Sequence, residues 1–358
     1  MKKYAFLYHP WNVPILYKMG IKEDSIEAKD IHFIEKTLEW LKPIRRKTEK
    51  IKSIQGNEVE CEMIMVPLTA EQILTLSPQF VLDKTIQAAQ LASDLGADLI
   101  GLGAYLSPVG RRGVQISKAV NKPVTSGTTY TISTGIQATL KAAQTIGIEI
   151  RNAKITIIGA TGSIGKACAK YLMGKAGHLV LSARSIDPLT SLKEELEQIS
   201  SNTKVESITQ AREAVKDSDI VVISTSCPST ILNISDFSEG CVVCDISVPH
   251  NISPDEANKK DVLVVDGGIV QFPHDVDFNY LALPKGVGYA CLSEATILAL
   301  EGRFESFSCG GDISYDKILE INNLADRHGF KLANFKSFGQ IVDDATIERI
   351  IKARKNRK

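Results

Sequence analysis

The chain has 358 residues, of which 44% are hydrophobic and 23% are charged. This composition excludes disordered and fibrous proteins, and the length predicts two domains with an appended C-terminal segment. Lysine and arginine total 42, as do aspartate and glutamate, so the chain has no net basic charge that would indicate a nucleic-acid partner. No apolar run approaches the roughly 20 residues that span a bilayer. Seven scattered cysteines fit a reducing compartment, and we expect a cytoplasmic protein with no transmembrane segment.

Residues 1–150 alternate short apolar runs with amphipathic segments, a pattern typical of α/β domains. The alternation predicts an N-terminal α/β substrate domain over this range. Its expected strands are 4–8, 60–67, 98–104 and 123–126, and its expected helices are 30–42, 78–95 and 131–146.

Basic residues gather in two places. Six lie between Lys42 and Lys52, and a basic tail covers Lys352–Lys358. One interpretation is a solvated helix face and a frayed chain end. The other is a docking patch for an acidic partner or a phosphate-bearing carrier.

A second alternation occupies residues 151–285, with apolar strands expected at 154–159, 178–184, 219–224, 241–247 and 262–266. Buried parallel strands have this continuous apolar character, so the range predicts a Rossmann-type, doubly wound parallel sheet that binds NADP. Residues 286–358 are expected to form a C-terminal helical segment, with helices at 292–301 and 317–328 before the basic tail.

Three glycines separate the strand 154–159 from a helix expected over about 163–175. In dinucleotide sites such glycines permit a tight turn, close approach of the backbone to a pyrophosphate, and close packing of helix on strand. The N-terminus of the following helix adds N–H groups and a positive dipole. The spacing here is G-x-x-G-x-x-G, and the alternative is an ordinary strand–turn–helix. The predicted cofactor contacts in this turn are Gly159, Thr161, Gly162, Ser163, Ile164 and Gly165.

The end of the second strand indicates which nucleotide binds. NAD enzymes place an acidic residue about 20 residues beyond the glycines, on the ribose 2′-hydroxyl. This chain has Ser182, Ala183 and Arg184 there instead. An arginine can pair with a 2′-phosphate, so Ser182 and Arg184 are assigned to cofactor binding and NADPH is favoured. The alternative is a solvated arginine at a strand end.

Cys291 follows a glycine-containing loop and opens the helix that ends at Gly302. A helix N-terminus stabilises a thiolate and lowers the thiol pKa, so Cys291 is a candidate nucleophile, against the alternative of a small buried residue. Glu294, three residues on, is in position to cap the first turn. Cys241 and Cys244 lie in a predicted strand, where residues three apart face opposite sides, so no metal site is predicted.

Hydroxyl groups cluster before the 131–146 helix, in the sequence Ser126–Tyr130. Thr128 and Thr129 can cap that helix or line a site for a carbonyl substrate. His274, beside two aspartates, is either a proton donor or a surface histidine.

Taken in order, these motifs resemble the long-chain acyl-[acyl-carrier-protein] reductases, which form aldehydes. The resemblance covers about residues 99–330, whereas the preceding residues match poorly. It implies that Cys291 is the acylated nucleophile, that Gly159, Gly162 and Gly165 hold the pyrophosphate, and that Arg184 selects NADPH. The stretches that carry it are Thr125–Thr131, Ile158–Gly165, Leu181–Arg184, Val265–Val270, Ala290–Ala295, Leu300–Gly302 and Arg327–Phe330.

The resemblance further implies reduction of an acyl thioester, carried by acyl-carrier protein or coenzyme A, through an acyl-enzyme on Cys291. The oxyanion would be held by N–H groups at the helix start and by the hydroxyl of Thr128 or Thr129. A downstream aldehyde-consuming enzyme is an expected partner. Two alternatives stay open: another NADP oxidoreductase, similar to shikimate dehydrogenase or glutamyl-tRNA reductase, and a non-enzymatic NADP-binding sensor.

Overall fold

The computed structural model describes residues 2–13, 28–225, 227, 231–247, 251–253, 255, 259–278, 281, 283–311, 313–334, 336–337 and 340–357. The chain divides into two compact units, neither of which is continuous in sequence. Unit 1 comprises Met1–Tyr130, Val270–Asp312 and Leu319–Lys331, and unit 2 comprises Thr131–Ile269, Ile313–Ile318 and Leu332–Lys358. This division differs from the three consecutive domains predicted from the sequence, 1–150, 151–285 and 286–358. The reason is that the chain leaves unit 1 after Tyr130 and returns to it at Val270.

Unit 1 is built on a five-stranded sheet of order β2-β3-β1-β4-β5. Strands β3, β1, β4 and β5 run parallel, and β2 is an antiparallel edge strand beside β3. The strands are β1 (Lys2–Tyr8), β2 (Ile44–Lys52), β3 (Glu58–Met65), β4 (Leu99–Leu102) and β5 (Val124–Thr125). Because β1 is central, both of its faces are covered, and its last five residues are buried.

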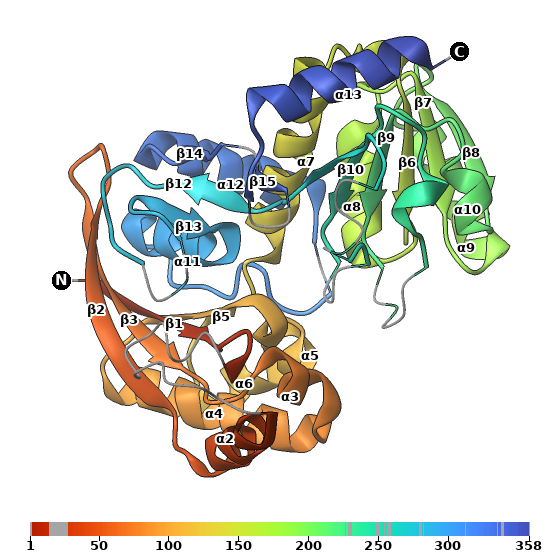
Figure 1. Cartoon of the computed structure of the whole chain (residues 1–358). Helices are drawn as coiled ribbons and strands as arrows, with labels where there is room; N and C mark the ends of the chain where they lie inside the picture. Colours follow the sequence, from red (N-terminus) through yellow and green to blue (C-terminus); the bar gives the residue numbers. More distant parts are fainter. Residues whose placement is uncertain are drawn as a thin grey trace. The chain divides into compact units, whose positions relative to one another are not determined.

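Helices cover both faces of this sheet (Figure 1). Alternate residues of β1 face opposite layers. Ala5 and Leu7 pack with α4 (Pro78–Asp94) and α6 (Val114–Val120), whereas Tyr4 and Phe6 pack with α11 (Ala290–Glu301). Residues on all sides of α11 are buried, as expected of a helix in a core. The helices assigned wholly to unit 1 are α2 (Ala28–Trp40), α3 (Ala70–Thr75), α4 (Pro78–Asp94), η1 (Ala104–Leu106), α5 (Val109–Arg112), α6 (Val114–Val120) and α11 (Ala290–Glu301).

Unit 2 contains a six-stranded parallel sheet of order β11-β10-β9-β6-β7-β8. Numbered within the unit, this is the order 3-2-1-4-5-6 of dinucleotide-binding Rossmann domains. The strands are β6 (Lys154–Ile158), β7 (His178–Ser182), β8 (Lys204–Ile208), β9 (Ile220–Ile223), β10 (Val242–Asp245) and β11 (Leu263–Val265). The predicted Rossmann-type parallel sheet is confirmed.

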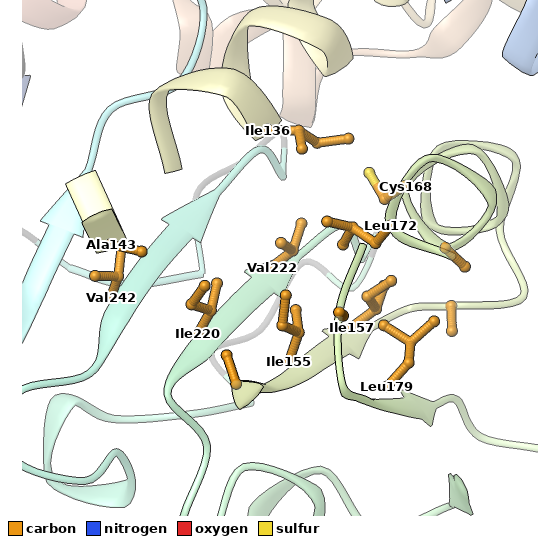
Figure 2. Close-up of a cluster of buried hydrophobic side chains, with 14 of the residues drawn as sticks. Ile136, Ala143, Ile155, Ile157, Cys168, Leu172, Leu179, Ile220, Val222 and Val242 are labelled. Atoms are coloured by element: carbon orange, nitrogen blue, oxygen red, sulfur yellow. The ribbon is translucent and has the colours of Figure 1, made fainter. Parts of the chain in front are cut away.

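One face of this sheet is packed by α7 (Thr128–Thr145) and α8 (Ser163–Leu172). Figure 2 shows Ile155 and Ile157 of β6, with Ile220 and Val222 of β9, meeting side chains from those two helices. The remaining helices are η2 (Ile150–Asn152), α9 (Ile186–Glu197), α10 (Ala211–Ala214), η3 (Ile234–Asp236), α12 (Tyr315–His328) and α13 (Asp344–Asn356). Short strands form the orders β13-β12-β14 and β15-β16: β12 (Ile269–Gln271), β13 (Val287–Tyr289), β14 (Lys331–Leu332), β15 (Lys336–Ser337) and β16 (Gln340–Ile341).

Two interpretations of the basic segments are wrong. The run from Lys42 to Lys52 is largely the edge strand β2 rather than a helix face. The C-terminal tail is not frayed: α13 runs to Asn356, and Arg354 and Arg357 both pair with Asp219.

Candidate active site

The glycine turn of unit 2 joins β6 to α8. The backbone N–H groups of Gly159 and Ala160 both donate to the carbonyl of Ser182, at 2.8 and 3.0 Å, so the turn is held on the end of β7. Gly159 has a φ of +80°, in the left-handed region that glycine adopts at low cost. A side chain there would also meet the Ser224 carbonyl oxygen at 2.8 Å.

The other two glycines differ in what surrounds them. A Cβ on Gly165 would lie 2.3 Å from the Gly159 carbonyl oxygen and 2.7 Å from the Ala160 Cα, so close packing of helix on turn requires this glycine. Gly162 is exposed, has an ordinary φ of −72°, and a Cβ there would meet only the Gly159 oxygen at 3.3 Å. A side chain at Gly162 would thus meet far less of the protein than one at Gly165, and Gly162 is the position where a dinucleotide site needs exposed backbone.

The remaining predicted cofactor contacts lie around this turn. Ser163 is the first residue of α8, whose N-terminus has no side-chain cap. Thr161 is half-buried before it, and Ile164 packs on the hydrophobic core. Ser182 is buried at the end of β7, and Arg184 lies exposed just beyond it, without an ion pair in the described part of the chain. These residues suit a phosphate-bearing dinucleotide, with Arg184 accessible to a 2′-phosphate.

In unit 1, Cys291 is the second residue of α11, as the sequence predicted for a thiol at a helix start. The helix crosses β4 closely, because a Cβ on Gly101 would lie 2.9 Å from the Cβ of Ala295. A Cβ on Gly127 would lie 2.2 Å from the Cα of Cys291, so the segment after β5 also lies directly against the thiol residue. The nucleophile candidate therefore lies among segments that follow the parallel strands, at the edge where α/β sheets bind ligands.

The expected direction of the Cys291 pKa is wrong. Burial raises the pKa of the thiol to about 11, and the charge of Glu294 acts in the same direction. The backbone N–H groups of Ala104 and Leu292 lower this pKa but do not offset the burial. Removal of the sulfur from water outweighs the helix terminus in the free protein.

Glu294 is a site residue whose role sequence reasoning missed. Its side chain is fully buried and does not cap the helix. It accepts hydrogen bonds from the Thr125 hydroxyl at 2.5 Å and the Tyr130 N–H at 2.9 Å, with further bonds to Gly127 and Ser308 that lower its pKa. Burial nevertheless raises the pKa of this carboxyl above its ordinary value. Glu294 thus ties the segment that contains Gly127 to the start of α11.

The two predicted threonines occupy different environments. Thr129 is fully buried and bonded to Ser308, which donates to its hydroxyl at 2.6 Å and accepts its N–H at 3.1 Å. Thr128 is half-buried and shares a hydrogen bond of 2.7 Å with Ser126. Thr128 therefore stays a candidate for contact with substrate, whereas Thr129 stabilises the segment around the thiol.

His274 accepts the backbone N–H of Lys52 through its Nε2 at 3.0 Å, and burial lowers its pKa. It therefore holds the end of β2. Two basic residues of β2 pair with acidic side chains: Arg45 with buried Glu62 at 2.8 Å, and Lys47 with Glu49 at 2.8 Å. Arg45 is thus committed to an intramolecular ion pair, which weakens the docking-patch interpretation.

Cys241 and Cys244 are buried, and burial raises the pKa of both thiols to about 12. Within the described ranges, no group of three or more His, Cys, Asp or Glu side chains is arranged to hold a metal. Among the described helices, none is both long and apolar enough to cross a membrane.

Comparison with known proteins links the chain to several oxidoreductases and one aminotransferase. It is 28% identical over 352 residues to aminotransferase PigE of a Serratia species, covering 95% of this chain but 41% of PigE. It is 28% identical over 296 residues to the long-chain acyl-[acyl-carrier-protein] reductase of Synechococcus elongatus, covering 78% of this chain and 83% of that protein. It is 26% identical over 220 residues to glutamyl-tRNA reductase of Aquifex aeolicus, covering 59% of this chain and 51% of that protein. The chain thus spans less than half the length of PigE.

Residues 141–267 match the family model described as Shikimate / quinate 5-dehydrogenase, and this range contains most of unit 2. The match agrees with the 3-2-1-4-5-6 sheet order and with the geometry of the glycine turn. It also supports the predicted cofactor, NADPH. The chain therefore carries a shikimate-dehydrogenase-like, Rossmann-type NAD(P)-binding domain.

Proposed function

We propose that this protein reduces an acyl thioester to an aldehyde with NADPH, through an acyl-enzyme on Cys291. The observation that carries the proposal is the position of the Cys291 thiol at the start of α11. Segments that follow parallel strands surround it there, within a chain that also carries a dinucleotide-binding domain. The similarity to a long-chain acyl-[acyl-carrier-protein] reductase over 78% of the chain supports the same reaction.

In the first step the sulfur of Cys291 attacks the thioester carbonyl carbon and the bond to the carrier sulfur breaks. One thioester replaces another, and the proton lost by Cys291 ends on the carrier thiol, so the exchange balances without an external base. The thiolate is the attacking form, and because burial raises the pKa of Cys291 the thiol is protonated in the free enzyme, so its deprotonation is part of the acylation step.

NADPH supplies the hydride that reduces the acyl group to the aldehyde. The residues assigned to hold it are Gly159, Thr161, Gly162, Ser163, Ile164 and Gly165 of the turn, with Ser182 and Arg184 at the end of β7. The open backbone at Gly162 suits the pyrophosphate, and the exposed guanidinium of Arg184 suits the 2′-phosphate.

We propose acyl-carrier protein or coenzyme A as the carrier of the acyl group, and the cytoplasm as the compartment, because a free catalytic thiol needs reducing conditions. The expected partner downstream is an enzyme that consumes aldehydes. The similarity to PigE agrees with such a partner, since aminotransferases accept carbonyl substrates and the chain covers 41% of PigE.

The test is incubation of the protein with a panel of acyl thioesters of both carriers, without NADPH, followed by mass spectrometry. We expect one acyl group on Cys291 in the wild type, none on Cys291→Ser, and unchanged labelling in the control Cys309→Ser, which removes another partly exposed thiol. Cys291→Ser should still bind NADPH. Aldehyde formation by Cys291→Ser near the wild-type rate would show direct hydride transfer and contradict the covalent mechanism.

A second candidate is a dehydrogenase of the shikimate type, which the family match over residues 141–267 favours. Such an enzyme needs no thiol, so Cys291→Ala would leave its activity on a hydroxy-acid substrate intact. Binding of NADPH without turnover or acylation would instead indicate an NADP-binding sensor.

A further inference from the structure

The segment after β4 has a backbone conformation that its sequence does not favour. Ala104, which begins η1, has a φ of +45° although it carries a Cβ. Residues other than glycine avoid the left-handed region because the Cβ meets a carbonyl oxygen. Such strain persists only where the surrounding structure imposes it, and it concentrates at functional sites.

The register of α11 on β4 locates this strained residue beside the nucleophile. Ala295 lies over Gly101, as their close approach shows. Cys291 is about one helical turn before Ala295, and one turn of about 5.4 Å corresponds to slightly less than two residues of a strand. Since the start of α11 lies toward the carboxyl end of β4, Cys291 lies over Gly103 and Ala104. The backbone N–H groups of Ala104 and Leu292 both act on the thiol.

His9 holds the turn in this conformation. The N–H of Gly103 donates to the carbonyl of Leu7 at 2.8 Å, which extends the pairing of β4 with β1. Two residues further on, the N–H of Tyr105 donates to Nε2 of His9 at 3.3 Å. Ala104 lies between Gly103 and Tyr105, so these two hydrogen bonds together fix the orientation of its own N–H.

The environment of His9 favours an acceptor nitrogen at Nε2. The residue is 7% exposed, and its Nδ1 lies 3.0 Å from the carbonyl oxygen of Pro10, which fixes the proton on Nδ1. Its ring packs edge-on against Trp11 and Tyr105, with centroids 6.0 and 5.6 Å away. Burial lowers the pKa of His9 to about 4, so the ring stays neutral and Nε2 keeps its lone pair.

We propose that the Ala104 N–H is an oxyanion donor for the carbonyl attacked by Cys291, and that His9 is the positioning residue that aims it. This inference rests on the acyl-enzyme proposed above. As the sulfur–carbon bond forms, the carbonyl electron pair moves to oxygen, which accepts hydrogen bonds from the N–H groups of Ala104 and Leu292. As the pair returns, the carrier sulfur leaves and takes up the proton that Cys291 gave.

The first test compares His9→Leu with His9→Gln. Leucine fills the space but removes the acceptor for the Tyr105 N–H, whereas the glutamine amide oxygen can replace Nε2. In single-turnover acylation of Cys291, we expect His9→Leu to lower the maximal rate ten- to hundredfold, with less than a threefold change in half-saturating thioester. We expect His9→Gln to restore the rate to within fivefold of the wild type. Equal rates in His9→Leu and the wild type would overturn the inference.

The second test needs no variant and reports on the oxyanion directly. An alkyl trifluoromethyl ketone forms a hemithioketal with Cys291, and its ionisation can be followed by ¹⁹F NMR. We expect the wild-type adduct to ionise at least one pH unit below the adduct of the same ketone with mercaptoethanol, despite the buried carboxyl of Glu294 on the same helix. Ionisation at the same pH would overturn the inference. Failure of the wild type to form acyl-Cys291 at all would instead refute the proposed function.

Discussion

The two later glycines of the dinucleotide turn provide a matched pair of substitutions, Gly162→Ala and Gly165→Ala. Both add one methyl group, within three residues of each other and beside the same carbonyl oxygen. The structure assigns them different neighbours, since a Cβ at Gly165 meets backbone at 2.3 and 2.7 Å, whereas a Cβ at Gly162 meets only one atom at 3.3 Å. They should therefore separate the requirements of the cofactor from those of the fold.

For Gly165→Ala, the turn or the helix must move, and overpacking of this kind costs about 1–3 kcal/mol. For Gly162→Ala the backbone angle is already one that alanine adopts, so the reduced entropy of the unfolded chain contributes about 0.4–1 kcal/mol of stability. The tight 3.3 Å contact acts against that gain. We therefore expect the stability of Gly162→Ala to lie within about 1 kcal/mol of the wild type.

The affinity for NADPH should fall in Gly162→Ala even though the stability of this variant is close to that of the wild type. The methyl group of Gly162→Ala occupies the exposed backbone where the pyrophosphate must approach. We expect at least a tenfold loss of NADPH affinity in this variant, measured by fluorescence titration of the reduced nicotinamide, with urea unfolding measured in parallel. An NADPH affinity equal to that of the wild type would remove Gly162 from the site. A loss of stability as large as that of Gly165→Ala would show that Gly162 serves packing instead.

Three further predictions concern charged and titratable groups. Arg184→Ala should lower the affinity for NADPH about ten- to hundredfold, because a charge-assisted hydrogen bond contributes about 1.5–3 kcal/mol. The affinity for NADH should stay within twofold of the wild type. Equal losses for both cofactors would contradict the assignment of Arg184. Since burial raises the pKa of Cys291 to about 11, its alkylation by iodoacetamide should rise about tenfold per pH unit from pH 7 to 10; a plateau near pH 8, measured by peptide mapping, would refute this. Glu294→Gln replaces one acceptor oxygen with an NH₂ group that faces buried donors. The free energy of unfolding should therefore fall by about 1–3 kcal/mol for each donor left unsatisfied. Because the pKa of Glu294 is raised in the folded protein, its ionisation reduces wild-type stability as the pH rises above 4.5, so the difference in unfolding free energy between the variant and the wild type should narrow above that pH. A difference that widens with rising pH, measured by urea unfolding, would contradict this.

The sequence predicted the nucleotide-binding sheet well because its signals are local. The strands β6, β7 and β9 are continuous apolar runs, buried on both faces, and the glycine turn follows β6 directly. The edge strand β8 was not predicted. Its sequence, Lys204–Ile208, mixes polar and apolar residues, and an edge strand needs burial on fewer sides.

The environment of the nucleophile depended on residues distant in sequence. The position of Cys291 at a helix start could be predicted from the glycine loop before it and Gly302 after it. Its pKa could not, because the burial comes from segments such as that of Gly127. Glu294 has the spacing of a capping residue, yet its partners lie between Thr125 and Tyr130 and at Ser308, and nothing in the local pattern indicates them.

The basic run was misread for a similar reason. Six basic residues close together indicate a solvated surface when their partners are not known. In the folded chain, Arg45 lies across from β3, where buried Glu62 accepts its hydrogen bonds together with that of Thr48. The charge pattern of β2 is complementary to a strand that follows it, which only the antiparallel register reveals.

The discontinuity of unit 1 has a consequence for synthesis on the ribosome. The helix α11, which covers one face of its sheet, begins about 190 residues after β4 ends, and a chain elongating at about 5–20 residues per second needs roughly 10–40 s to cover that distance. During this interval the face of β1 that carries Tyr4 and Phe6 lacks its covering helix. The sheet of unit 2, by contrast, has all six strands once residue 265 has emerged. The six-stranded sheet should therefore form before the unit whose synthesis began first has its full core, whereas α13 joins unit 2 only at the end of synthesis. In a nascent chain whose emerged part ends between residues 270 and 290, the strands β6 to β11 should resist proteolysis better than unit 1.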